Sequence, residues 1–216
     1  MMNLLISTFV LCSSVLYYCN ASFVAVFLTE DIKNLLKDKF LRSHQRSSPY
    51  FGNSAHIYCE HSTIEFNSRS YLTNKYKAHC GDKQKFIILA YAEDEHAQTI
   101  LVHSVDKNDN HPSANEYPHV TLGVSGVAPY TPVYSNDLWK RLVDDGIVEV
   151  QMDDYDKPRT ISMKNQTDEW DGKLRSYEKY DETQVYIKII NELIELNGIV
   201  CMDSLWQKDK CKSLRN

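Results

Sequence analysis

The sequence predicts an α+β fold, on two observations. Short apolar segments rich in β-branched and aromatic residues, typical of strands, are mixed with three segments whose apolar residues recur at helical spacing. Two of the strand segments are separated by only six mostly polar residues, which is hairpin spacing. Strands joined by close hairpins, with a few helices among them, are typical of antiparallel sheets that carry helices on one side.

The first predicted elements are a buried strand and a helix. The run Phe23–Leu28 is apolar throughout, and Thr29 follows it at the position of a helix cap. Helical spacing then relates Ile32, Leu35, Leu36 and Phe40, with Lys and Asp residues on the other face. Residues 43–54 have the composition of a loop, in which Tyr50 and Phe51 are candidates for stacking on the base of a bound substrate.

The middle of the chain predicts a hairpin, a short helix and another strand. Strands are expected at 85–92 and 99–105, with Glu93–Gln98 as their connection and polar segments at 67–84 and 106–116 on either side. Ser135–Asp137 would cap a helix over 138–144, which Gly146 ends before a strand at 147–152.

The C-terminal part predicts an extension of the core. Residues 153–181 are charged and irregular, which indicates an insertion or a surface excursion. An amphipathic helix is expected over Glu182–Leu196, with Asn197–Gly198 as its stop and an apolar stripe formed by Val185, Ile189, Leu193 and Leu196. The predicted division is therefore a core at 22–152 and an extension at 153–216 whose helix packs on the core.

Residues 1–21 have the pattern of a secretory signal peptide. Leu4–Tyr18 is mostly apolar but too short for a comfortable membrane span, and Cys19 and Ala21 are small residues that suit cleavage after Ala21. The alternatives are an uncleaved anchor or a hydrophobic first strand. We therefore expect secretion, or the lumen of the secretory pathway if the signal stays, and no stable membrane span after cleavage.

Cysteine use agrees with an oxidising compartment. Cleavage would leave Cys59, Cys80, Cys201 and Cys211, which allow three disulfide connectivities; the most local pairs are Cys59–Cys80 and Cys201–Cys211. Asn165 opens the sequon Asn-Gln-Thr and is a candidate glycosylation site on a surface loop. Neither Cys-x-x-Cys nor His-Glu-x-x-His occurs, so neither a metal nor another cofactor is predicted.

The charge balance limits the class of ligand. The chain carries 24 basic and 29 acidic residues, a net charge of −5. Broad binding of a nucleic-acid backbone needs a basic surface, so extended nucleic-acid binding is not expected. Binding of a small nucleotide in a local pocket is compatible with the acidic net charge.

Two short motifs are the candidate site. His61-Ser62-Thr63-Ile64 and His119-Val120-Thr121-Leu122 share the pattern histidine, any residue, threonine, aliphatic residue, and no other histidine of the eight has threonine two positions later. Side chains two residues apart on a strand point to the same face, so each histidine would lie beside its threonine. Neighbouring strands would bring two imidazoles and two hydroxyls together.

The two motifs, in this context, resemble those of the 2H phosphoesterase superfamily, the LigT-like phosphodiesterases. The strand–helix opening before His61 and the Ala92-Glu93-Asp94 hairpin before His119 are similar to that superfamily, and the segments 113–115 and 133–136 are similar to its branch related to RNA-repair and tRNA-ligase domains. The resemblance covers about residues 23–150. It implies a bilobal fold, in which two antiparallel sheets with helices outside face a central cleft and each contributes one motif.

The resemblance also implies a chemistry. His61 and His119 would act as general acid and base without a metal, since the ordinary pKa of histidine lies near neutral pH. Thr63 and Thr121 would donate hydrogen bonds to the phosphoryl oxygens. The implied substrates are 2′,3′-cyclic phosphate ends of RNA, 2′-5′ oligoadenylates or 2′,3′-cyclic GMP–AMP. A stand-alone, secreted monomer of this kind could counter nucleotide-based immune signalling.

Three alternatives remain open from the sequence. The chain could be a secreted, non-catalytic binding protein on the same scaffold, although both motifs keep their His and Thr. It could be an unrelated α+β domain in which His61 and His119 never meet. A metal nuclease ranks last, because no carboxylate cluster with suitable spacing occurs.

Overall fold

The structure is a computed structural model that describes residues 21–41, 56–105, 111–126, 130–154, 156–178 and 180–203. Its strands are β1 (Ala21–Leu28), β2 (His56–Ile57), β3 (His61–Ser68), β4 (Lys83–Asp94), β5 (Ala97–Ser104), β6 (His119–Val124), β7 (Val148–Met152), β8 (Pro158–Met163), β9 (Glu169–Leu174), β10 (Thr183–Ile189) and β11 (Glu195–Met202). Its helices are α2 (Glu30–Leu36), continued by a π-helical turn (Lys37–Leu41), α3 (Arg69–Tyr76) and α4 (Tyr134–Asp144).

The main sheet closes on itself. Its strand order is β11-β1-β3-β6-β5-β4, and β4 also pairs with β11, so six antiparallel strands form a closed barrel. The long strand β4 makes this possible: Lys83–Ile87 pairs with β11, whereas Ala90–Asp94 pairs with β10, which continues to β9. The α+β prediction is thus confirmed, with mostly antiparallel strands.

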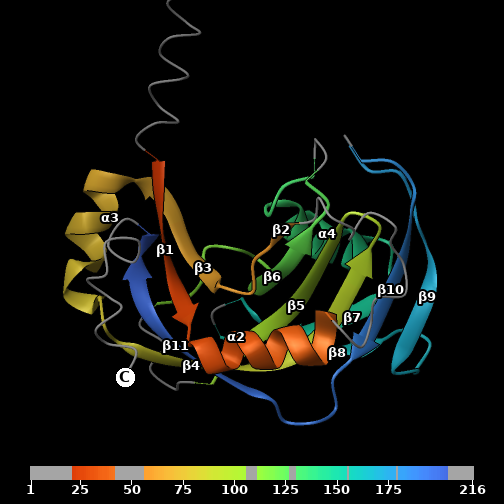
Figure 1. The fold of residues 1–216 in the computed structure, drawn as a ribbon. Coiled ribbons are helices and arrows are strands. Elements are labelled where there is room, and N and C mark those ends of the chain that lie inside the picture. Colours follow the sequence, from red (N-terminus) through yellow and green to blue (C-terminus); the bar gives the residue numbers. More distant parts are fainter. Residues whose placement is uncertain are drawn as a thin grey trace, which may run out of the picture.

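Two large apolar clusters hold these strands together. The first takes side chains from all six barrel strands, so it fills the barrel interior; Val26, Ile64, Ile88, Ile100, Leu122 and Val200 belong to it, with Leu36 and Phe40 of the α2 segment. The second packs α4 and β8 against residues of β4, β5 and β10. Figure 1 shows α3 beside β1, β3 and β11 on one side of the molecule, and α4 with β9 and β10 on the other.

The predicted elements before residue 152 are largely confirmed. The strands at 23–28, 85–92, 99–105 and 147–152 correspond to β1, β4, β5 and β7, and the hairpin connection is in place. Helix α4 begins at Tyr134, before the predicted cap, and Gly146 follows its end with a φ of 67°. Helix α3 was not predicted in the polar segment 67–84, because Leu72 and Tyr76 are its only buried side chains.

The predicted helix over 182–196 is wrong. Residues 183–189 form β10 and residues 195–202 form β11, both within the main sheet. Val185, Ile187 and Ile189 are buried on one face with a period of two, and Leu193, expected on the apolar stripe, is 74% exposed in the connection. The segment 153–216, predicted as an extension with a helix, therefore supplies strands β8 to β11.

The predicted pair Cys59–Cys80 is also wrong, since both are free thiols. The Cys59 thiol is buried and donates to the Leu122 carbonyl (Sγ to O, 3.6 Å). Cys80 instead forms a hydrogen bond with the backbone of Met202 on β11. Cys201 is disulfide-bonded, and Cys211, its predicted partner, lies outside the described residues.

Three further features concern the surface and the chain ends. Asn165 is exposed in the turn between β8 and β9, as expected of a surface sequon. Residues 1–20 of the predicted signal lie outside the described residues, as do Tyr50 and Phe51. Within the described part of the chain, the helices are too short or too polar to cross a bilayer.

Candidate active site

The two His-x-Thr motifs lie side by side on neighbouring strands. In the antiparallel pair β3–β6, Ser62 is opposite Val120. This register places His61 opposite Thr121 and Thr63 opposite His119, all four on the face away from the Ser62 and Val120 side chains. Cβ atoms directly opposite each other are about 5 Å apart in such a pair.

A change of direction before His61 sets this register. Residues 56–59 follow β6 through hydrogen bonds from the Tyr58 and Cys59 amides to the Leu122 and Thr121 carbonyls. Cys59 then adopts a left-handed φ of 53°, and the Glu60 carbonyl accepts from the Leu28 amide instead. The chain thereby passes from β6 to β1, and His61 is the first residue paired with β1, opposite Phe27.

His61 lies in an apolar and electropositive environment. Its ring stacks on Phe23 (4.8 Å between centroids) and contacts Phe27 (5.3 Å), and its Nδ1 is buried without a hydrogen-bond partner in the described structure. Burial, the largest cause, and the charges of His119 and Lys33 together lower the pKa of His61 from 6.5 to about 4.

His119 is held in one tautomer. Its Nδ1–H donates to the Tyr117 carbonyl at 2.8 Å, which leaves Nε2 as the nitrogen that carries the lone pair. Burial lowers the pKa of His119, while the Tyr117 carbonyl and the charge of Asp137 act in the opposite direction. A neutral imidazole with a fixed acceptor nitrogen can take a proton.

Thr121 is tied to the start of α4. Its hydroxyl lies 2.9 Å from Ser135 Oγ and 3.3 Å from the Pro132 carbonyl, and it can donate to either. Ser135, fully buried in the first turn of α4, was predicted as a helix cap and as part of the segment 133–136, without a contact to Thr121. The spacing of 14 residues from Thr121 gave no sign of this contact.

A buried network fixes that helix start. Asp94, at the end of β4, accepts hydrogen bonds from the His96 and Ala97 amides and from the Tyr134 hydroxyl. Arg141 donates to the same hydroxyl at 2.8 Å. The hairpin containing Asp94 therefore positions Tyr134, and with it the adjacent Ser135.

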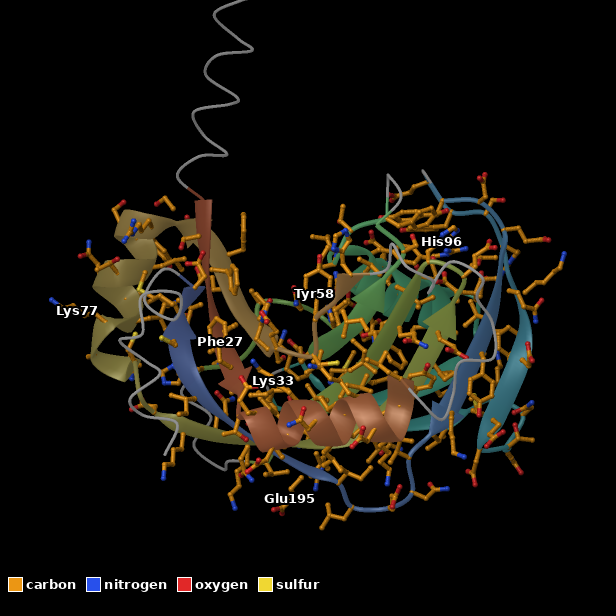
Figure 2. The ribbon with its side chains drawn as sticks, in the orientation of Figure 1. Phe27, Lys33, Tyr58, Lys77, His96 and Glu195 are labelled. Atoms are coloured by element: carbon orange, nitrogen blue, oxygen red, sulfur yellow. The ribbon has the colours of Figure 1, made fainter. Side chains whose placement is uncertain are left out.

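Lys33, like Ser135, lies near the motifs although the sequence did not indicate it as a site residue. It was assigned to the polar face of α2, yet its side chain is 8% exposed and forms an ion pair with Glu30 at 3.1 Å. It precedes Leu36 by three positions, a spacing that could have placed it on the buried face. Figure 2 shows Lys33, Phe27 and Tyr58 around the same region, where β1 and α2 meet the motif strand.

A cavity borders the motif strand β3. It has a volume of about 280 Å³ and reaches Ile64 and Val102 in the barrel interior, but neither motif histidine lines it. Ser62, whose side chain points away from His61, is among its lining residues. Thr63 also lines it, so the cavity borders the motif strand β3 at one of the four motif side chains.

The described residues around the motifs provide two imidazoles, two threonine hydroxyls and one lysine. Groups that exchange protons, donate hydrogen bonds and carry positive charge suit an anion such as a phosphodiester. No protein-family model matches this chain and no curated protein is similar to it in sequence, so the site is defined by its own geometry.

Proposed function

We propose that the chain is a phosphodiesterase of the 2H type, which hydrolyses 2′-linked or cyclic phosphodiesters of small nucleotides or RNA ends without needing a metal. The observation that carries this proposal is the antiparallel register with Ser62 opposite Val120, since it sets the two motifs side by side on one face of the sheet. An unrelated domain would have no reason to align them.

The proposal includes a division of the barrel strands into two lobes. Strands β3 and β6 share a single residue pair, so the ring is weakly joined there. Strands β1, β3 and β11 form one group and β6, β5 and β10 the other, while β4 runs through both. The motif side chains sit where the groups meet, which is where a bilobal phosphodiesterase would bind its substrate.

The reaction assigns His119 as base and His61 as acid. His119 Nε2 takes a proton from a water whose oxygen attacks phosphorus. The bond from phosphorus to the leaving ribose oxygen breaks, and His61 gives that oxygen a proton, so that a phosphomonoester and a hydroxyl result. A bound phosphodiester carries a negative charge, which raises the pKa of His61 and charges it for this role.

The threonines and Lys33 act on the phosphoryl group. Thr63 and Thr121 donate to its non-bridging oxygens, and the Thr121 hydroxyl then accepts a hydrogen bond from Ser135 instead of donating one to it. The Lys33 charge, already close enough to lower the pKa of His61, attracts the anion. Lys33 is the lysine that acts on His61 among the described residues, and the net charge of −5 on the chain favours a small substrate over a polymer.

One observation favours a second candidate, a nucleotide-binding protein without turnover. Burial keeps both imidazoles neutral in the free protein, and with a pKa of about 4 His61 holds no proton near neutral pH. If a bound phosphate failed to raise that pKa, the leaving oxygen would have no donor. Binding of a nucleotide without hydrolysis would identify this case.

The test is hydrolysis by the purified chain, in EDTA, of a 2′,3′-cyclic nucleotide, a 2′-5′ adenylate and 2′,3′-cyclic GMP–AMP. His61→Asn and His119→Asn should each reduce kcat/KM about 10²- to 10⁴-fold. The matched control is His56→Asn, an exposed histidine on β2. Absence of turnover on all three substrates, or turnover insensitive to both substitutions, would eliminate the mechanism.

A further inference from the structure

A second cluster of ionisable side chains lies away from the two motifs. His79 Nδ1 is 3.1 Å from one oxygen of Asp82, and His111 Nε2 is 3.3 Å from the same oxygen. One ligand atom from each residue lies within 4.8 Å of the other two. The two rings contact edge to face, with centroids 4.3 Å apart.

The backbone holds this cluster in place. His79 ends the turn after α3, and the Asp82 amide donates to its carbonyl at 3.0 Å. Gly81, between them, has a φ of 108° that suits glycine, and its amide donates to the Val200 carbonyl on β11. Val200 in turn donates to the Asp82 carbonyl, so the turn is fixed to the barrel on both sides.

The third member comes from a distant part of the chain. His111 lies between β5 and β6 and is 29 residues from Asp82. Its side chain is 8% exposed, whereas those of His79 and Asp82 are 40% and 50% exposed. The cluster therefore has one buried wall and one side open to water.

We propose that His79, Asp82 and His111 bind a divalent transition-metal ion of the zinc class. Two ligands about 2.05 Å from a tetrahedral zinc ion lie about 3.4 Å apart, close to the two nitrogen–oxygen distances observed. Two imidazoles and a carboxylate suit zinc, cobalt or nickel better than calcium or magnesium, which prefer oxygen ligands. The open side leaves room for water as the fourth ligand.

The position of His111 indicates what the ion does. The segment after it docks on β3, where Ser113 Oγ donates to the Thr63 carbonyl at 2.7 Å, and then leads to His119. An ion would join this segment to the turn fixed on β11. It therefore acts as a clip that stabilises the approach to the second motif, and this role does not depend on the proposed hydrolysis.

The competing explanation is a metal-free cluster in which both imidazoles donate hydrogen bonds to Asp82. Titration of the full chain, without a polyhistidine tag, with Zn²⁺ and with Co²⁺ separates the two. We expect one equivalent to bind, a rise in Tm with Zn²⁺, and a Co²⁺ spectrum lacking the sulfur-to-metal charge-transfer band that Cys59 or Cys80 would give.

Two variants locate the site. His111→Ala and Asp82→Asn should each weaken Zn²⁺ binding by more than about 100-fold, since even residues that only support metal ligands are worth 10- to 100-fold. Asp82→Asn changes a half-exposed side chain and keeps its shape, so this variant should fold even if the substitution at the buried His111 prevents folding. His56→Ala should bind as the parent does. Failure to bind one equivalent, or equal binding by parent and both variants, would overturn the proposal.

Discussion

The environment of His61 predicts a specific loss of stability in acid, which can be measured without knowing a substrate. Its pKa is about 4 in the folded protein and 6.5 is its ordinary value. The unfolded chain therefore binds the proton more tightly than the folded one. The contribution of the neutral, buried His61 ring to the free energy of unfolding is therefore fully present above about pH 6.5 and is lost as the pH falls toward 4.

The magnitude follows from these two pKa values. Between about pH 8 and about pH 5, preferential protonation of the unfolded state should reduce the free energy of unfolding by about 2 kcal/mol. The full difference, reached below pH 4, is about 3.4 kcal/mol, at 1.36 kcal/mol for each pKa unit. His61→Asn removes the titrating group. Over the same pH interval the free energy of unfolding of this variant should therefore decrease by about 2 kcal/mol less than that of the parent.

The assay is urea unfolding of both proteins across this pH range, with His56→Asn as the exposed-histidine control. Proton NMR of the His61 ring, assigned by its absence in His61→Asn, gives the pKa directly. In His119→Asn the pKa of His61 should rise, because the positive charge that His119 carries when it is protonated in acid has been removed. A His61 midpoint near 6.5, or the same pH dependence in parent and His61→Asn, would refute the reasoning.

Three other substitutions test the packing around the site. Ser135→Ala removes a hydrogen-bond partner of Thr121 and should lower kcat/KM for any hydrolysed substrate about tenfold, the worth of one hydrogen bond, with little change in Tm. Gly198→Ala would place a Cβ 2.5 Å from a Val26 methyl and should destabilise by about 1–3 kcal/mol in urea unfolding, whereas the exposed neighbour Asn197→Ala should change stability by less than about 0.5 kcal/mol. Tyr134→Phe leaves a buried carboxyl and a buried guanidinium without their shared hydroxyl, and should cost about 1–3 kcal/mol in the same assay.

The free thiols bear on how the chain responds to oxidation. Burial raises the pKa of Cys59 to about 12, so this thiol carries almost no reactive thiolate at neutral pH. Cys80 is less buried, and its pKa is raised for the same reason. In the folded protein burial therefore makes both thiols less reactive than a fully exposed cysteine.

Local sequence patterns determined much of the framework. Continuous apolar runs with β-branched and aromatic residues predicted β1, β4 and β5, and glycine ended α4 where expected. The repeated His-x-Thr pattern identified the motif strands, because alternation alone puts histidine and threonine on one face. These features depend on a few adjacent residues, which is the range over which a sequence can be interpreted directly.

Other features depended on the closed barrel. The run around Val185 to Ile189 fits periods of both 2 and 3.6, and only its pairing with β4 and β9 selects the strand. The convergence of His61 with His119 rests on the left-handed turn at Cys59 and on the register of β3 with β6. The sequence thus determined which side chains share a face, whereas closure of six strands decided which faces meet, since register between distant segments is fixed by the packing of the whole barrel.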